Sequence, residues 1–336
     1  MKKIYLLCTG GTIAASRGCD GLTPTLTGEE ILKFIPGMQG YCHIDVAELF
    51  NIDSTNMTPE HWCAIAKQIQ AHYDAYDGFV ILHGTDTMAY TAAALSYMVQ
   101  NSQKPIVLTG SQKPICLDVT DAKTNLTDSL RYACDEESSG VQVVFDGRVI
   151  AGTRAKKTHA HSYDAFSSVN FPLLAVIQEG KIIRYLPPIT YTAPVAFFLH
   201  VHRSIAVLKL IPGSQPALLE YMFRQYDCLL IEGFGVGGLP AHLEDAFCKL
   251  MAQFTRDGKL AVITTQVLNE GSNMEVYEVG QRVKRAFDLL ETYDMTFEAA
   301  VTKLMYLMAR HPGQYDAIRK GFYQTIHYDI LDPQRG

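Results

Sequence analysis

Two short glycine turns constrain the fold of this chain more than any other feature, because each directly follows a run of apolar residues. The first run covers residues 4–8 and leads into residues 9–14, and the second covers residues 78–82 and leads into residues 83–88. Apolar runs of this length, bounded by turn residues, are typical of buried parallel strands. Parallel strands end at one edge of a sheet, where loops form a crevice and helix N-termini point into it. Both turns are therefore predicted to present threonines at the ligand-binding edge of one sheet.

The length of 336 residues favours two domains, since one hydrophobic core rarely supports a chain of this size. Strand-like and helix-like segments alternate up to about residue 188 and again from residue 204, with a proline-containing segment between them. We therefore expect an α/β protein with two α/β domains. Residues 1–188 form a larger N-terminal parallel-sheet domain with a β-hairpin, residues 189–203 form a linker, and residues 204–336 form a smaller C-terminal Rossmann-like domain.

Local patterns place several elements within this scheme. Thr58 followed by proline predicts a helix start, because proline suits the first helical position. A second helix is predicted to begin within residues 83–87 and to run to Val99. Residues 141–150 carry Asp-Gly between two apolar runs, which is the strongest hairpin signal in the chain.

Composition narrows the classes of partner. The net charge of −6 supplies no broad positive field for nucleic acid, and no apolar stretch approaches the roughly 18 to 20 residues that a membrane helix needs. The apolar run after Met1 is cut short at Thr9, so no signal peptide is expected. The eight cysteines include no Cys-x-x-Cys pair, which favours reduced thiols. These features favour a cytoplasmic protein with a small-molecule substrate, no nucleic-acid partner and no membrane partner.

Both glycine turns, together with three further segments in the same order, resemble the bacterial-type L-asparaginase family. The first turn reads Thr-Gly-Gly-Thr-Ile and the second reads His-Gly-Thr-Asp-Thr, and the further segments are residues 51–57, 108–112 and 152–160. The resemblance is to the cytoplasmic type I branch. It implies hydrolysis of L-asparagine to L-aspartate and ammonia (an L-asparaginase of the EC 3.5.1.1 class), no cofactor, no metal, and a homodimer or homotetramer.

Amide hydrolysis needs a nucleophile, a base, an acid for the leaving ammonia and donors for the oxyanion. The family's catalytic positions correspond here to Thr12, Thr85, Asp86 and Lys157. Thr12 is our expected nucleophile, and Thr85 is expected to activate water or to relay a proton to Lys157, which Asp86 orients. The residues themselves leave open an exchange of the two threonine roles, or direct attack by water.

Further positions are implied by the same resemblance to hold the amino-acid head group of the substrate. The substrate-binding set is Asp53, Ser54, Thr55, Gly84, Asp86 and Ser111. Many members of the family carry a tyrosine in the mobile loop after the first threonine, where this chain has Leu22. Leucine donates no hydrogen bond, so closure of that loop must depend on another residue or on packing.

Two other patterns suggest different sites. Residues 233–238 fit the Gly-x-Gly-x-x-Gly fingerprint after a strand, but Leu-Pro precedes the next helix, so a tight structural loop is the favoured interpretation over a dinucleotide site. His159 and His161 could bind zinc with Asp164, but no third histidine or cysteine lies close by, which favours structural roles.

Two rival functions follow from these patterns. One is the glutaminase subunit of a tRNA-dependent amidotransferase, which carries the same core motifs but has an additional N-terminal domain. The other is a non-catalytic module that binds an amino acid or nucleotide, with the glycine loop at Gly233 as its site.

Overall fold

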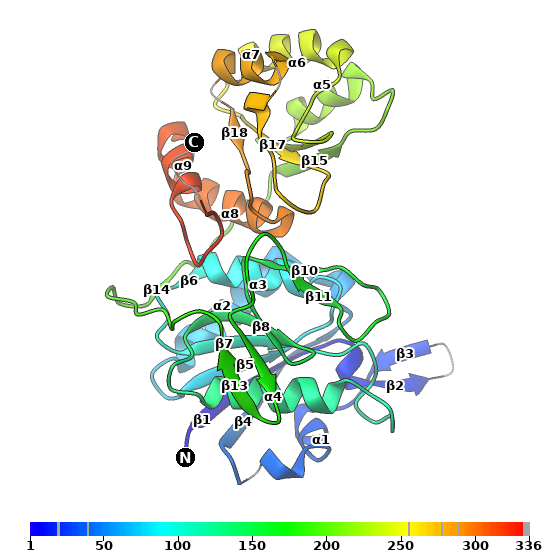
Figure 1. The fold of residues 1–336 in the computed structure, drawn as a ribbon, viewed down its shortest axis with the longest axis vertical. Helices are drawn as coiled ribbons and strands as arrows, with labels where there is room; N and C mark the ends of the chain where they lie inside the picture. Colours follow the sequence, from blue (N-terminus) through cyan, green and yellow to red (C-terminus); the bar gives the residue numbers. More distant parts are fainter. Residues whose placement is uncertain (19–20, 39, 255, 277, 288, 332–336) are drawn as a thin grey trace. The chain divides into compact units, whose positions relative to one another are not determined.

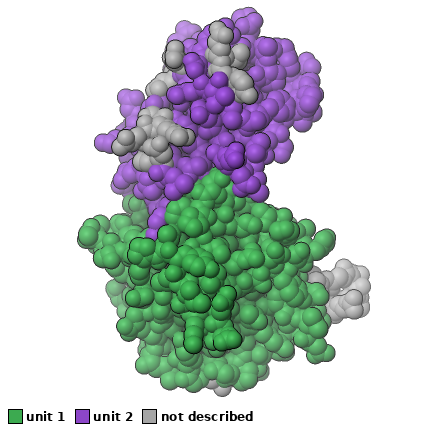
Figure 2. Space-filling model, in the orientation of Figure 1, with its two compact units in different colours: residues 1–199 green, residues 200–336 purple. Residues whose placement is uncertain are grey.

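The computed structural model describes residues 1–18, 21–38, 40–254, 256–276, 278–287 and 289–331. The chain divides into two compact units, residues 1–199 and 200–336, which Figure 2 colours separately. Each unit has its own sheet covered by helices (Figure 1), so the expectation of two α/β domains with the larger one first is confirmed. In the part of the chain that the structure describes, no helix is both long and apolar enough to span a bilayer.

The first unit is built on one large sheet whose central strands are parallel. Buried apolar side chains fill these strands, as expected for a sheet covered on both faces. In spatial order the strands are β13 (Lys181–Arg184), β12 (Ala175–Gln178), β9 (Arg148–Ala151), β8 (Gly140–Phe145), β7 (Pro105–Thr109), β5 (Gly78–Leu82), β1 (Lys3–Gly10) and β4 (His43–Ile52). The two predicted strands are therefore β1 and β5, which pair in parallel with Leu6 opposite Val80.

Helices cover both faces of this sheet. The helices are α1 (Gly28–Leu32), α2 (Pro59–His72), α3 (Met88–Met98) and α4 (Ala122–Cys134). Phe79 stacks on Tyr73 at the end of α2, whereas a side chain at the adjacent Gly78 would meet the Ala133 carbonyl of α4. Because neighbouring residues of a strand point to opposite faces, α2 and α4 lie on opposite faces of the sheet. Trp62 of α2 donates to Thr91 of α3, which places these two helices on one face.

The connections to and from β7 differ in hand. The chain steps from β5 through α3 to β7 and from β7 through α4 to β8, in one direction across parallel strands. Since α3 and α4 lie on opposite faces, the two crossovers have opposite hands, which is rare because right-handed crossovers pack best on a twisted sheet. One of the two connections is therefore left-handed, and between them these connections carry Thr85 and Ser111.

Several predicted elements are confirmed, with shifted ends. The hairpin is β8 and β9, joined at Asp146 and Gly147, which both have positive φ as a two-residue turn requires. The helix predicted from Thr58 is α2. The helix after the second glycine turn begins at Met88 rather than within residues 83–87, and it ends at Met98, because Val99 starts the short strand β6 (Val99–Gln100).

The first unit also contains short two-stranded sheets outside the large sheet. They are β2 (Ala15–Gly18) with β3 (Gly21–Pro24), β10 (Ala155–Lys157) with β11 (Phe166–Ser168), and β6 with β14 (Ala196–Phe197). Strand β14 lies within residues 189–203, the segment predicted as a linker. The predicted boundaries of the two domains stay a prediction. The expected loop with Leu22 corresponds to the β2–β3 hairpin. Neither Asp20 nor the side chain of Leu22 is among what the structure describes.

The second unit is a smaller parallel sheet with helices. Its strands are β15 (Ile205–Lys209), β16 (Cys228–Gly233), β17 (Leu260–Thr265) and β18 (Leu290–Glu291). One apolar core joins β15, β16 and β17 to α5 (Pro216–Gln225), α6 (Ala241–Phe254) and α7 (Glu278–Phe287), with Phe223 stacked on Phe254. Helices α8 (Phe297–Arg310) and α9 (Tyr315–Tyr323) follow. The unit has the predicted Rossmann-like alternation.

Candidate active site

A cavity of about 210 Å³ lies at the carboxyl-end edge of the large sheet. It is formed by the segments that follow β1, β4 and β5, which are neighbours in the sheet. Its lining residues are Gly11, Thr12, Ala15, Asp53, Ser54, Gly84, Thr85 and Asp86. The two glycine turns, far apart in sequence, therefore meet at one site as the sequence predicts. Strand β4, which delivers Asp53 and Ser54, was not identified from the sequence.

Two glycines let these segments approach one another closely. A side chain at Gly11 would lie 2.5 Å from the backbone nitrogen of Gly84, and Gly11 also has a φ of +83°. A side chain at Gly84 would lie 2.6 Å from Cβ and Oγ of Ser54. Both distances are shorter than nonbonded contacts allow, and positive φ disfavours other residues. The glycines are thus required for the three segments to share one cavity.

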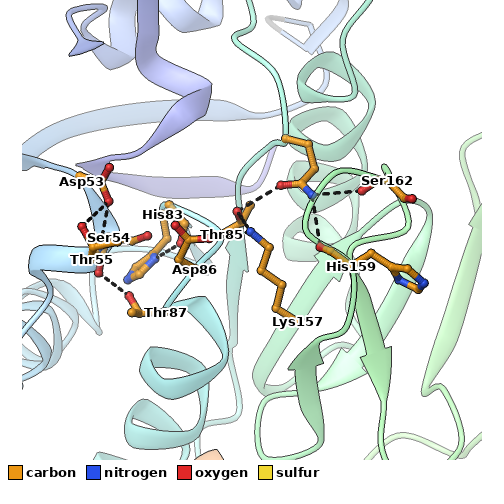
Figure 3. Close-up of polar contacts among 12 residues, drawn as sticks. Asp53, Ser54, Thr55, His83, Thr85, Asp86, Thr87, Lys157, His159 and Ser162 are labelled. Carbon is orange, nitrogen blue, oxygen red and sulfur yellow. Dashed lines mark hydrogen bonds and ion pairs between the residues drawn. The ribbon is translucent and has the colours of Figure 1, made fainter. Parts of the chain in front are cut away.

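A lysine reaches the second glycine turn from the β10–β11 hairpin (Figure 3). The Lys157 Nζ donates to Thr85 Oγ1 at 2.8 Å and to Asp86 Oδ1 at 2.6 Å. Thr85 is buried, the Lys157 side chain is 18% exposed, and the Asp86 side chain is 55% exposed. One oxygen of a hydroxyl and one of a carboxylate therefore hold the amine at the rim of the cavity. Three of the four predicted catalytic residues are in direct contact.

The fourth residue, Thr12, lies on the same cavity from the opposite turn. It starts a short 3₁₀ helix (Thr12–Ala14) directly after Gly11 and is only partly exposed. Among the described residues, no hydrogen bond involves its hydroxyl, in contrast to that of Thr85. Because the Thr12 hydroxyl makes no such hydrogen bond, it is available to a bound substrate, as a nucleophile must be.

The predicted binding residues are not all placed alike. Ser54 is buried and lines the cavity together with Asp53 and Gly84. Thr55 is exposed, and its N–H and hydroxyl both donate to Asp53 Oδ1, at 2.8 Å and 2.9 Å (Figure 3). Ser111 is buried, and its hydroxyl donates to the Lys113 carbonyl. Thr55 and Ser111 do not line the cavity, so the part that these two residues play in binding stays a prediction.

A buried hydrogen-bond chain supports the second turn. His83 is fully buried, and burial lowers its pKa to about 4, so the imidazole is neutral near pH 7. Its Nδ1 lies 2.7 Å from the Gly84 carbonyl, which only accepts, so Nδ1 carries the proton. Nε2 then accepts from Thr91 at 2.9 Å, and Thr91 accepts from Trp62. This chain fixes the carbonyl beside Thr85. His83 belongs to the second glycine turn, but its local sequence predicts no role for it.

The two alternative patterns do not form ligand sites in the described residues. In the Gly233 loop the N–H groups of Phe234, Gly237 and Gly238 bond to carbonyls of the loop itself, at 2.7 to 3.0 Å. They are therefore not free to hold a phosphate. His159 Nδ1 faces the backbone carbonyl of Asp164 rather than its carboxylate. No group of three or more potential metal ligands occurs among the residues described.

A hydroxyl paired with a lysine amine at the edge of an α/β sheet is the chemistry of hydrolases that attack a carbonyl through oxygen. Comparison with known proteins narrows this class. Residues 3–190 match the family model "Asparaginase, N-terminal", and residues 204–322 match "Glutaminase/Asparaginase C-terminal domain". The chain belongs to the asparaginase family.

Similar proteins cover nearly the whole chain. L-asparaginase 1 of Escherichia coli strain K12 is 36% identical over 98% of this chain and 98% of its own length. The structure of the thermostable L-asparaginase from Thermococcus kodakarensis superposes with a TM-score of 0.91 at 34% identity, over 98% of this chain and 99% of that one. A glutamyl-tRNA(Gln) amidotransferase component of Methanosphaera stadtmanae is 33% identical over 91% of this chain and 72% of its own length.

Proposed function

We propose that this protein is an L-asparaginase that converts L-asparagine and water to L-aspartate and ammonia. The observation that carries the proposal is the contact of Lys157 with Thr85 and Asp86 beside the cavity that Thr12 lines. Support from comparison is the 36% identity to L-asparaginase 1 over nearly the full length of both chains.

The proposed reaction runs through an ester on Thr12. The Thr12 oxygen attacks the side-chain carboxamide carbon of asparagine, and the C–N bond then breaks, with nitrogen leaving as ammonia after it gains a proton. Water attacks the resulting ester, the bond to Thr12 breaks, and Thr12 regains its proton. Thr85 passes protons between the reacting oxygen and Lys157, and Asp86 holds Lys157 in place.

The cavity also supports a binding arrangement for the head group. The Asp53 and Asp86 carboxylates suit the α-ammonium group, and Ser54 with the neighbouring backbone N–H groups suits the α-carboxylate. The small volume of about 210 Å³ and the polar lining support a small polar substrate such as asparagine.

We further propose a cytoplasmic homodimer or homotetramer that needs no metal or cofactor. Cytoplasmic location is supported by cysteines without close sequence pairing, and seven of them are free thiols in the structure. The amidotransferase function is less well supported, because the match covers a smaller share of that relative.

Ammonia release from asparagine and from glutamine, measured in parallel, tests the proposal. The two amides differ by one methylene, which a pocket that merely accommodates both would separate by roughly 1 to 3 kcal/mol. We expect a preference for asparagine that is expressed mainly in kcat, because the longer side chain misplaces the carboxamide relative to Thr12. Equal kcat values, or faster turnover of glutamine, would refute asparagine as the principal substrate.

A further inference from the structure

Gln112 is the second partner of the Thr85 hydroxyl, beside Lys157, and it has no role in the proposed mechanism. Thr85 Oγ1 lies 3.2 Å from Gln112 Oε1 and 2.8 Å from Lys157 Nζ. A hydroxyl has only one proton to donate. The direction in which Thr85 donates it therefore decides whether Lys157 is its donor or its acceptor.

The surroundings of Gln112 fix which end of its amide faces Thr85. The Gln112 Nε2 lies 3.1 Å from the Ser162 carbonyl and 3.5 Å from the His159 carbonyl. Both carbonyls only accept, so the NH₂ end must face them and the oxygen end must face Thr85. The amide oxygen cannot donate. Thr85 consequently donates to Gln112, and the lone pairs of its hydroxyl oxygen are left for Lys157.

The buried carboxylate of Asp121 anchors the backbone at Gln112. Asp121 accepts from the backbone N–H of Gln112 at 2.8 Å and from that of Lys113 at 3.1 Å. Asn125 donates to the same carboxylate at 3.1 Å. Asp121 is 7% exposed, so its hydrogen bonds are shielded from water. The backbone that carries Gln112 is therefore anchored independently of the amide.

We propose that Gln112 is a positioning residue whose amide oxygen accepts a hydrogen bond from the Thr85 hydroxyl while Lys157 is an ammonium ion. If Lys157 is neutral and Thr85 turns its proton to the amine, the Thr85 and Gln112 oxygens face each other with no hydrogen between them. Gln112 thus stabilises the state in which the relay has delivered a proton to Lys157, and it sets the pH at which the relay becomes basic. The inference rests on the proposed function, because it assumes that Thr85 and Lys157 exchange a proton.

Other charged groups also act on Lys157, and a test must separate them from Gln112. Asp86 is in direct contact, and the remaining titratable groups belong to the segments around the amine. These groups are Asp53 after β4, Lys113 and Asp121 after β7, and Lys156, His159, His161 and Asp164 of the β10–β11 hairpin. Substitutions at Gln112 leave all of them in place.

The experiment compares two variants of similar size, Gln112→Met and Gln112→Glu, through kcat and KM for asparagine between about pH 5 and 9. Methionine removes the acceptor, so the acidic limb of the kcat profile should move to lower pH. Glutamate keeps an acceptor and adds negative charge, so the limb should move to higher pH. Each limb should move by roughly half a pH unit or more. The Met variant should also lose roughly tenfold in kcat with KM within about threefold.

Two further variants make the outcome decisive. Gln142→Met is a matched control, because Gln142 is a buried glutamine of β8 that donates to the Ser139 carbonyl and contacts none of the site residues described above. It should leave the profile unchanged. Unmoved limbs, or limbs that move the same way in both Gln112 variants, would overturn the role of Gln112 alone. Retained activity in Lys157→Met, or no ammonia release by the wild-type protein, would instead overturn the relay or the proposed function.

Discussion

The glycine-rich turn after β5 and the glycine-rich turn after β16 both follow parallel strands, but their polar groups have different partners. The turn after β5 carries Gly84 and places a hydroxyl and a carboxylate against Lys157 at a cavity. The turn after β16 fits a dinucleotide fingerprint, yet the backbone N–H groups of Phe234, Gly237 and Gly238 bond to the loop itself. A glycine pattern therefore marks a close approach of backbone, and whether a ligand binds depends on which polar groups remain available.

Removing either threonine is the strongest test of the site that the turn after β5 helps to form. Thr12→Ala and Thr85→Ala should each lower kcat by roughly 10²- to 10⁴-fold, because both hydroxyls belong to one proton-transfer unit. The double variant should lose little more than either single variant, since effects within one unit are not additive. Ammonia release measures all three. A single variant that retained more than about a tenth of the wild-type kcat would disprove the two-threonine assignment.

Separate variants of Lys157 and Asp86 distinguish proton transfer from substrate binding. Lys157→Met should lower kcat far more than it raises KM, because the amine moves a proton and does not hold the substrate. Asp86→Ala should affect both constants, since Asp86 contacts Lys157 and lines the cavity. Steady-state kinetics on asparagine measures both. If both variants raised KM alone, with kcat unchanged, the two residues would belong to binding.

A methyl group placed at each turn sharpens the comparison. Gly84→Ala should lower kcat at least roughly tenfold and should also destabilise the fold, because the new methyl would lie 2.6 Å from Ser54. Gly235→Ala in the other turn meets nothing within 4 Å, so only its φ of +51° opposes the change, at a cost of about 1 kcal/mol in unfolding free energy. Denaturant unfolding and kcat should be measured together. An unchanged kcat in Gly84→Ala would contradict the proposed close packing.

The buried His83, in the turn after β5, makes the unfolding free energy depend on pH, with a smaller effect than the changes above. The unfolded chain binds a proton at His83 below about pH 6.5, whereas the folded protein does so only below about pH 4. The unfolding free energy should therefore fall as pH drops through this window, by up to about 2 to 3 kcal/mol, and should be fully retained above it. Urea unfolding of the wild type and His83→Gln at pH 7 and 5 measures this contribution.

The glutamine variant has no titrating group at this position, so its loss of stability between the two pH values should be smaller than that of the wild type. Equal losses would mean that His83 does not contribute. A variant of the second unit offers a control, because His242 is exposed and bonds through Nε2 to the backbone carbonyl of Ser214. His242→Gln should lose stability with falling pH as the wild type does.

The sequence predicted the parts of this protein that depend on local pattern. Apolar runs identified β1 and β5, Asp-Gly identified the β8–β9 hairpin, and ordered motifs identified the residues that surround the cavity. These succeed because strand burial and turn geometry are written into neighbouring residues. Strand β4 was missed, although it delivers Asp53 and Ser54, because its polar and half-buried residues lack the apolar run of a central strand.

Only the tertiary structure decided which polar groups meet. Gln112 and His83 stood within quoted motifs, but nothing in their local sequence shows that one accepts from Thr85 or that the other supports Gly84. Thr55 shows the opposite case, because it is predicted to bind substrate, whereas in the structure its hydroxyl donates to Asp53 and it does not line the cavity. Hydrogen bonds, both between near neighbours and between distant residues such as Thr85 and Gln112, depend on distances of a few tenths of an ångström, which are set by packing of whole elements. A motif specifies which chemical groups are present, and the fold determines their partners.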